Sequence, residues 1–543
     1  MASQASIRPL LQQAYLVGLM MMAVGLPLSP FLMSLSQFWL VIVWLADACT
    51  MKGTGFKDKF LRFWHNTPAV LLVAFYLMHV VGLLYTSDFQ YALKDLRVKL
   101  PILVLPFIMS GMAPLDRKRF NLLIQVYVLS VFVATLFSFS TYMRHDYGDV
   151  REISHFISHI RFCLNIVFCI AIVMWYIATH YETNAKIGLD QCLQFILGLW
   201  FVYQIYIFES LSGYVILAAV VVVSAVYAFL RWKKGRGWRI GIGVSAAAVL
   251  TLGVLLMLHW VKPLLKVEPV DFGTLEKKTA LGNDYWHDTI HNPIEDGRYV
   301  GLYYCRKEMQ EAWPQRSAMP LDGFTCDGES LEATLARYLT SKGLRKDAEG
   351  VMALTDEDIR NIEQGVANYN NWLHPGLRAR LSSTLFEYGL YRRYDNPNGG
   401  SLSQRIEYTR ASFHIIRQHW LVGVGTGDVP QAFSQAYDEI RSPLKEEFRF
   451  HAHNQYLAIA VAFGVLGLAF FLFVLFQPCF LSKKSRTYLY VVFLCIMVLS
   501  MFAEDTLETQ AGASMFAFFE AVLLLASPYG QLQPPLEGQK NKK

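Results

Sequence analysis

The chain has 543 residues, of which 54% are hydrophobic, 14% aromatic and only 17% charged. Soluble globular proteins carry about 25% charged residues. The composition therefore excludes a disordered chain, a coiled coil and a small disulfide-stabilised scaffold, and it argues against a purely soluble enzyme. The formal net charge is +6, but the positions of the charges along the chain are more informative than their sum.

Long apolar runs dominate the sequence. Runs of roughly 17–25 apolar residues are typical of transmembrane helices, and about twelve are present. They cover residues 13–33, 36–50, 68–85, 99–113, 121–142, 158–179, 189–208, 212–230, 240–262, 453–479, 487–503 and 511–527. No small-residue cleavage pattern follows the first run, which favours a retained helix over a removed signal peptide. No strand pattern competes strongly, so we expect an all-α polytopic membrane protein.

Basic residues are distributed unevenly between alternate connections of these runs. With the N-terminus in the cytoplasm, about 20 Lys and Arg residues fall on the inner side and about 5 in the short outer connections, Lys99 among the latter. The positive-inside rule therefore predicts cytoplasmic N- and C-termini and an even number of spans.

One connection is much longer than the others and divides the chain. We expect a membrane domain over 1–262 with helices 1–9, an extracytoplasmic loop domain over 263–450, a second membrane part over 451–530 with helices 10–12, and a cytoplasmic tail over 531–543. The loop domain has helix signals of its own, including the capping pattern of Thr355 and Asp358 and the amphipathic run that begins at Ser330. Its two cysteines, Cys305 and Cys326, are candidates for a disulfide in an oxidising compartment.

The first candidate site residue is Arg161, at the outer start of the run 158–179 and preceded by His155 and His159. An Arg guanidinium can bind phosphate with two parallel hydrogen bonds and stays charged at every relevant pH. A charge slightly inside a span favours an anion clamp at membrane level, although the side chain could also reach the lipid headgroups. His159 is a further candidate for substrate contact.

Two more features precede the run 453–479. Arg405 begins a helical segment after a Gly/Ser turn and is a second candidate for anion binding. The sequence GVGTGD contains Gly423, Gly425 and Gly427, whose N–H groups could contact a phosphate. A tight turn that packs close to the membrane is the alternative for these glycines, and their spacing does not fit a dinucleotide fold.

His451, His453 and Asn454 lie at the outer start of the same run. A histidine near its ordinary pKa of about 6.5 is a good general base. The two imidazoles are two residues apart and would point about 200° apart on a helix, so they cannot readily share one metal ion. We therefore predict no metal. Glu209 and the pair Glu504 and Asp505 are weaker candidates on the same side.

Three segments resemble the O-antigen ligase/polymerase superfamily. HAHNQYLAIAVAFGVLGL resembles its His-Asn segment, SLSQRIEYTRASFHIIRQHWLVGVGTGD is similar to its Arg-led helix with a Gly-x-Gly-x-Gly end, and ISHIRFCL resembles its Arg at the start of a middle span. Two positions depart from the family pattern. Ser212 stands in Leu-Ser-Gly where many members have Ser-Arg-Gly, and Tyr408 replaces a common Trp.

The resemblance implies a glycosyltransferase of the bacterial cytoplasmic (inner) membrane with its site on the periplasmic face. Its donor would be a glycan on a polyprenyl diphosphate, and its acceptor a sugar hydroxyl of lipid A-core or another glycan. Arg161 and Arg405 would bind the diphosphate, His453 or His451 would act as the base, and Ser212 and Asn454 are further candidate substrate contacts. Displacement would invert the anomeric centre. No cofactor or nucleic acid is expected, and membrane lipid is the surrounding partner.

Three alternatives remain open at this stage. A polysaccharide polymerase and a protein O-oligosaccharyltransferase would use the same type of donor with different acceptors. A transporter belongs to a different class, and it would require ionisable residues deep within the spans. The predicted spans contain almost none, which favours an enzyme with its site at the membrane surface.

Overall fold

A computed structural model of the chain describes residues 2–51, 54–144, 150–183, 188–231, 236–482 and 486–528. Within these residues the fold is all-helical as expected, apart from one two-stranded hairpin of β1 (Ile294–Glu295) and β2 (Arg298–Tyr299). Part of the charge count and the predicted tail lie outside the described residues, namely Lys52, Lys186, Lys233, Lys234, Lys483, Lys484 and 531–543.

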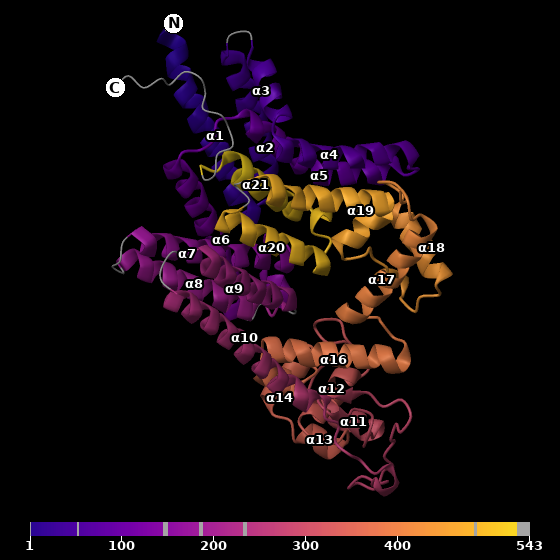
Figure 1. The fold of residues 1–543 in the computed structure, drawn as a ribbon. Coiled ribbons are helices and arrows are strands. Elements are labelled where there is room, and N and C mark those ends of the chain that lie inside the picture. Colours follow the sequence, from indigo (N-terminus) through magenta and orange to yellow (C-terminus); the bar gives the residue numbers. More distant parts are fainter. Residues whose placement is uncertain are drawn as a thin grey trace.

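The helices of the first half of the chain form a bundle around the largest hydrophobic core. They are α1 (Ala2–Leu28), α2 (Pro30–Thr50), α3 (Gly55–Trp64), α4 (Thr67–Val81), η1 (Gly82–Tyr85), α5 (Phe89–Gly111), α6 (Arg117–Arg144), α7 (His159–Thr183), α8 (Leu189–Ile207), α9 (Leu211–Arg231) and α10 (Arg236–Leu265). The bundle is completed by α19 (Gln455–Leu481), α20 (Tyr488–Ala503) and α21 (Gln510–Ala521). Helices from both ends of the sequence thus pack together, with α19 against α4 and α21 against α5 (Figure 1).

The boundary predicted between the first two spans is wrong. The run 13–33 crosses a helix break, since α1 ends at Leu28 and α2 begins at Pro30. The Ser29 side chain accepts a hydrogen bond from the Leu32 N–H at 3.2 Å, and Pro30 occupies the first helical position, where no backbone donor is needed. A Ser-Pro pair inside an apolar run therefore ends one helix and starts the next.

Seven described helices are long and apolar enough to cross a membrane, which makes the chain a multi-pass membrane protein. They are Arg8–Leu28, Pro30–Thr50, Thr67–Tyr85, Arg117–Arg144, His159–Thr179, Leu211–Leu230 and Gln455–Leu481. Three shorter apolar helices accompany them: Thr251–Leu265, Tyr488–Ala503 and Gln510–Ala526. The remaining predicted runs, 99–113 and 189–208, lie on α5 and α8. The expected total of about twelve spans is not confirmed.

The expectation that the bundle helices carry almost no ionisable residues is also wrong. Lys99 lies well inside α5, is nearly fully buried, and pairs with Asp95 one turn earlier and with Glu508 at 2.5 Å. Glu520 in α21 is buried as well and accepts a hydrogen bond from the Tyr490 hydroxyl at 3.2 Å. Each of these buried groups has a polar partner, as buried ionisable groups require.

The segment 263–450 contains several short helices and two separate cores. Its helices are α11 (Arg306–Ala312), α12 (Leu331–Ser341), α13 (Ala348–Met352), α14 (Asp356–Glu363), α15 (Tyr369–Leu373), α16 (Leu377–Tyr394), α17 (Ser401–Gln418) and α18 (Val429–Glu439). The predicted caps are confirmed: Ser330 caps α12, and Thr355 with Asp358 forms a capping box on α14.

The first core of this segment surrounds Trp313 and Tyr338, and we call residues 266–376 around it the outer domain. The second core surrounds Tyr408 and Phe433 and includes Val461 of α19. The helices α11–α14 lie at the end of the molecule opposite α1, whereas α17 and α18 lie against one end of α19 (Figure 1). Helices α17 and α18 therefore share a core with the first part of α19, while α16 contacts α10.

The two cysteines of this segment form no disulfide in the structure. Cys305 is buried at the N-cap of α11, and its N–H donates to the Lys346 carbonyl. Cys326 is exposed, and its N–H donates to the carbonyl of Glu363 at the end of α14. The two thiols are fixed on different elements of the outer domain and both remain free.

Candidate active site

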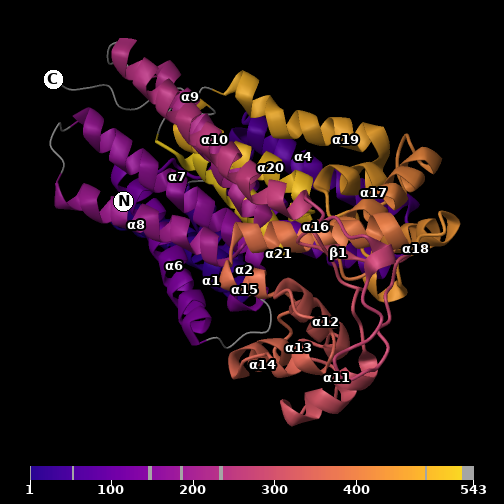
Figure 2. The same ribbon diagram turned by 90° about the horizontal axis from the view of Figure 1, so that it is seen from below.

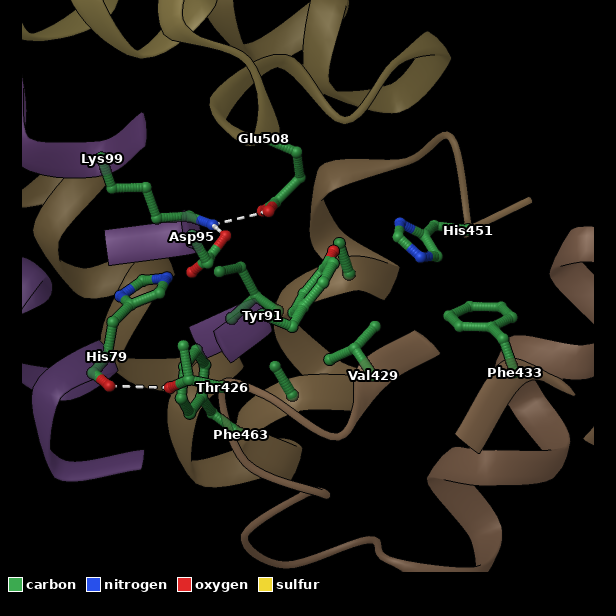
Figure 3. A pocket seen from close by; sticks show the side chains of 13 residues that line it. His79, Tyr91, Asp95, Lys99, Thr426, Val429, Phe433, His451, Phe463 and Glu508 are labelled. Atoms are coloured by element: carbon green, nitrogen blue, oxygen red, sulfur yellow. Dashed lines mark hydrogen bonds and ion pairs between the residues drawn. The ribbon is translucent and has the colours of Figure 1, made fainter. Parts of the chain in front are cut away.

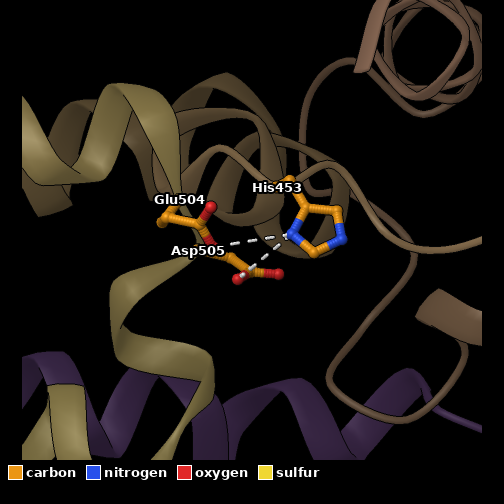
Figure 4. Close-up of side chains that lie close together, drawn as sticks. All are labelled: His453, Glu504 and Asp505. Atoms are coloured by element: carbon orange, nitrogen blue, oxygen red, sulfur yellow. Dashed lines mark ion pairs between the residues drawn. The ribbon is translucent and has the colours of Figure 1, made fainter. Parts of the chain in front are cut away.

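Two adjacent carboxylates, Glu504 and Asp505, form the centre of a charged site between α20 and η7 (Thr506–Glu508). Arg405 Nη2 lies 2.5 Å from Glu504 Oε1, and Arg161 Nη2 lies 3.8 Å from Glu504 Oε2 and 3.5 Å from Asp505 Oδ1. His453 Nδ1 faces the same pair at 3.7 and 3.9 Å (Figure 4). Three residues singled out from the sequence, far apart along the chain, are thus brought together.

Arg161 is held at the first turn of α7. Its backbone carbonyl accepts a hydrogen bond from the Asn165 amide at 2.8 Å, and Asn165 in turn accepts one from the buried Tyr127 hydroxyl. Its Nη1 reaches Ser158 Oγ at 3.2 Å, while its Nε is buried and makes no hydrogen bond within the described chain. The guanidinium therefore keeps an unused donor inside the site.

His453 occupies a strained backbone position. Its φ of 43° lies in the left-handed region, which non-glycine residues rarely adopt. The ring packs beside Tyr408 with centroids 5.4 Å apart, and its Nδ1 is buried without a hydrogen bond at normal distance. Such strain at a site persists only where the surrounding structure fixes the residue, so the imidazole is held in one orientation toward the carboxylates.

The surroundings shift the pKa values of the two carboxyl groups in opposite directions. Burial acts to raise the pKa of Glu504, but His453, Arg405 and Arg161 together outweigh it, so that pKa lies below its ordinary value. Burial raises the pKa of Asp505 above its ordinary value, aided by Glu508 and only partly opposed by His453 and Arg161. Glu504 is therefore the firmly ionised member of the pair.

His451, the other candidate base, lies in different surroundings. Its ring is edge-on to Tyr91 with centroids 6.1 Å apart and also packs near Phe433. It lines a small cavity of about 30 Å³, close to the volume of one water molecule, together with Lys99 and Glu508 (Figure 3). Burial lowers the pKa of His451, with Glu508 and Asp505 opposing the shift.

We call Lys99, Asp95 and Glu508 the lysine cluster. Glu508 follows Asp505 by three residues, and Gln455 joins the same segment by donating to Glu508 Oε1 at 2.9 Å and accepting from the Leu507 N–H at 2.6 Å. The cluster thus ties α5 and α19 to the short segment that carries the site carboxylates. The sequence analysis missed it because Lys99 was counted as a loop charge. The signal was an Asp and a Lys four residues apart, entering an apolar run.

The glycines of GVGTGD serve close backbone packing. The N–H groups of Gly423, Gly425 and Gly427 donate to His419 O, Ala462 O and Thr86 Oγ1. A Cβ on Gly427 would lie 2.0 Å from the Asp88 carbonyl oxygen, and Gly425 has φ 92°. These donors are occupied, which favours the tight turn over the phosphate cradle.

The loop also meets a kink in α19, where Gly464 has a non-helical φ of 64°. Asp428 closes the contact from the other side, because its carboxylate accepts hydrogen bonds from the Ser87 and Asp88 N–H groups at 2.8 and 2.9 Å. The loop is therefore locked between α19 and the connection from α4 to α5.

The remaining predicted residues lie in supporting positions. Asn454 caps α19, with its side chain accepting from the Leu457 N–H and donating to the Phe502 carbonyl. Ser212 lies in the first turn of α9 and is 3.1 Å from Ser210 Oγ. His159 is the first residue of α7. Glu209 accepts a hydrogen bond from the Gly376 N–H and so ties the outer domain to the bundle.

The donor atoms of His453, Glu504 and Asp505 lie within 4.8 Å of one another, close enough to hold a metal ion. Two guanidinium groups already pair with these carboxylates, however, and a divalent cation would bring further positive charge beside them.

The comparisons with known proteins bear on part of this region. Residues 355–472 match the family model described as O-antigen ligase. The match includes Arg405, His453 and the glycine loop, and it identifies an O-antigen ligase domain in the chain. Such a domain implies a transferase of lipid-linked glycans. Arg161, Glu504 and Asp505 lie outside the matched residues. No curated protein matches the chain significantly.

Proposed function

We propose that the chain transfers a glycan from a polyprenyl-diphosphate carrier to a sugar hydroxyl of lipid A-core, with inversion and without a metal ion. The observation that carries the proposal is the convergence of Arg161, Arg405 and His453, from three separate parts of the chain, on one pair of carboxylates. Two cations and one imidazole in a single outer site match the needs of a diphosphate leaving group and a hydroxyl nucleophile.

In this mechanism His453 Nε2 takes the proton of the acceptor hydroxyl. The acceptor oxygen forms a bond to the anomeric carbon, and the bond from that carbon to the diphosphate oxygen breaks, with both electrons leaving on the diphosphate. Because Nδ1 faces the carboxylates, Nε2 is the nitrogen available to the acceptor, and Glu504 and Asp505 stabilise the imidazolium that forms.

Arg161 and Arg405 bind the diphosphate and stabilise the charge that develops on it. Their side chains differ in access, since that of Arg161 is 12% exposed and that of Arg405 is 36% exposed. Arg405 can therefore exchange its bond to Glu504 for a phosphate oxygen with little rearrangement, whereas Arg161 provides a more fixed charge deeper in the site.

The test uses purified protein in lipid nanodiscs, a synthetic polyprenyl-diphosphate oligosaccharide and a lipopolysaccharide-core acceptor. Release of free polyprenyl diphosphate is measured by mass spectrometry. We expect Arg161→Ala, Arg405→Ala and His453→Ala to lose transfer, while the exposed Arg417→Ala on α17 and His414→Gln serve as matched controls. Unchanged release by the three site variants would overturn the mechanism. A loss of wild-type activity in EDTA would overturn metal independence.

The three candidate acceptors are distinguished by the glycans that accumulate in cells that lack the protein. Loss of a ligase leaves long carrier-bound glycan unattached, loss of a polymerase leaves a single repeat on the core, and loss of a protein O-oligosaccharyltransferase leaves both patterns normal. A transporter would need ionisable groups along a path through the bundle. Lys99 instead pairs with Asp95 and Glu508 beside the outer site.

A further inference from the structure

The outer domain presents a hollow that the transfer mechanism does not use. Its volume is about 500 Å³, within the range of small-ligand sites. It is lined by Asn283, Asp284, Trp286, Tyr304, Cys305, Arg306 and Lys307. The adjoining helix α11 lies apart from α4 and α19 in both views (Figures 1 and 2).

Two aromatic rings form a rigid corner in this hollow. Trp286 is 60% exposed, yet its backbone exchanges two hydrogen bonds with Tyr304 at 2.8 and 3.0 Å. The two ring planes are 88° apart with centroids separated by 6.1 Å. The Tyr304 hydroxyl donates to Glu332 at 2.7 Å, which fixes the second ring. The Tyr304 ring and the backbone of Trp286 are therefore held in place before any ligand binds, which lowers the entropy cost of binding.

The indole of Trp286 also offers a free donor. Among the described residues, no group accepts a hydrogen bond from its ring N–H. A large indole with an open face and an unused N–H on a soluble domain costs the free protein burial energy. Such an exposure, beside a hollow of ligand size, points to a bound partner with an apolar face and polar edges.

The rim of the hollow carries charged groups of both signs, which offer hydrogen-bond donors and acceptors. Lys307 Nζ lies 3.3 Å from Asn283 Oδ1 and has two more N–H donors to offer. Asp284 is largely exposed, and its carboxylate holds Lys278 at 2.8 Å while keeping acceptor sites open. An ammonium, a carboxylate and an amide around an aromatic corner match the hydroxyl groups and the C–H face of a sugar ring.

We propose that this hollow is a saccharide-binding site in which one sugar ring stacks on the Trp286 indole. The proposal rests on the proposed function only for the source of the saccharide, which is either the acceptor oligosaccharide or the glycan on the carrier. A glycan held here is tethered to the same chain that carries the transfer site, which raises its effective concentration for transfer.

The experiment measures binding without transfer. The full chain in nanodiscs is titrated calorimetrically with two probes, a delipidated lipopolysaccharide-core oligosaccharide and the oligosaccharide released from the carrier. We expect one probe to bind, Trp286→Ala to weaken it about tenfold, and Trp286→Phe to weaken it less because a ring remains. Phe324→Ala removes an equally exposed aromatic outside the hollow and is the matched control.

The outcomes separate this proposal from the proposed function. Equal affinity of wild type and Trp286→Ala, a loss as large in Phe324→Ala, or no binding of either probe at millimolar concentration would overturn the saccharide site. Binding that depends on Trp286 in a protein that transfers no glycan would support the site and overturn the transferase. The probe that binds identifies whether the site serves acceptor or donor.

Discussion

The two imidazoles of His451-Ala452-His453 belong to two different charge clusters. The first, around His453, is open: the side chains of His453 and Arg405 are about one-third exposed, and their charges can be reached by a substrate. The second, the lysine cluster beside His451, is closed, because Lys99 is 2% exposed and is already paired with two carboxylates. Similar chemical groups thus lie in two different environments, one accessible to a substrate and one enclosed by fixed partners.

The two clusters are joined through one short segment. Glu504 and Asp505 face the open cluster, and Glu508 of the same segment belongs to the closed one. The closed cluster therefore holds the carboxylates that the open cluster uses. Changes in the open cluster should affect transfer first, and changes in the closed cluster should affect stability first.

The largest effect is expected for His453→Ala. Removal of a general base costs about 10² to 10⁴ in rate, so transfer should fall by that factor with little change in melting temperature. His451→Gln should retain most of the activity, because its ring faces the closed cavity. The measurement is release of polyprenyl diphosphate by both variants under identical conditions. Equal losses in the two variants would show that the imidazoles do not divide into a reacting and a supporting one.

Lys99→Met should produce the next largest effect, in stability. It leaves Asp95 and Glu508 buried without their cation, which costs about 3–5 kcal/mol. Lys99→Arg keeps the charge and should recover part of the loss. Thermal unfolding in detergent measures both variants. A Lys99→Met protein that melts at the same temperature as wild type would contradict a stabilising role for the lysine cluster.

The sequence predicted the open cluster better than the closed one. Arg161 and His453 are predicted because each lies at the start of an apolar run on the same predicted side, and Arg405 because it begins a helical segment after a Gly/Ser turn. Glu504 was ranked low, since nothing in its neighbourhood indicates that it would pair with Arg405, 99 positions away.

The prediction of the fold from the sequence has the same limit. The apolar runs predicted most helices, but a Ser-Pro pair moved the first boundary, and Lys99 was assigned to a loop although it lies inside α5. Composition indicates which segments are apolar. Tertiary pairing decides which charges can be buried among them, and one sequence alone does not reveal that pairing.

Arg405→Lys should give a moderate effect in the open cluster. Lysine keeps the charge but loses the planar guanidinium that binds two oxygens at once. We expect transfer to fall about tenfold to a hundredfold, equivalent to about 1.4–2.7 kcal/mol, with unchanged stability. Kinetic constants for the polyprenyl-diphosphate donor provide the measurement, with Arg417→Lys on the same helix as control. Wild-type kinetics would remove Arg405 from diphosphate binding.

The smallest effect concerns the pH dependence of stability through His451. Its pKa in the folded protein lies below the ordinary 6.5, chiefly because of burial. The unfolded chain therefore binds more protons below about pH 6.5, and stability should fall as the pH decreases, by at most about 1.4 kcal/mol per pH unit. His451→Gln should flatten the fall in melting temperature between about pH 6.5 and 5, and the exposed His374→Gln should not. The carboxyl group of Glu504 also has a pKa below its ordinary value in the folded protein, but it titrates at lower pH than His451. Its contribution to stability is lost only as the pH falls below the ordinary 4.5. The pKa of Glu508 in the closed cluster is lowered as well, chiefly by Lys99 against the opposing effect of burial, so carboxylates of both clusters titrate in that range. A loss of stability confined to that lower range would therefore exclude His451 as the source of the acid sensitivity.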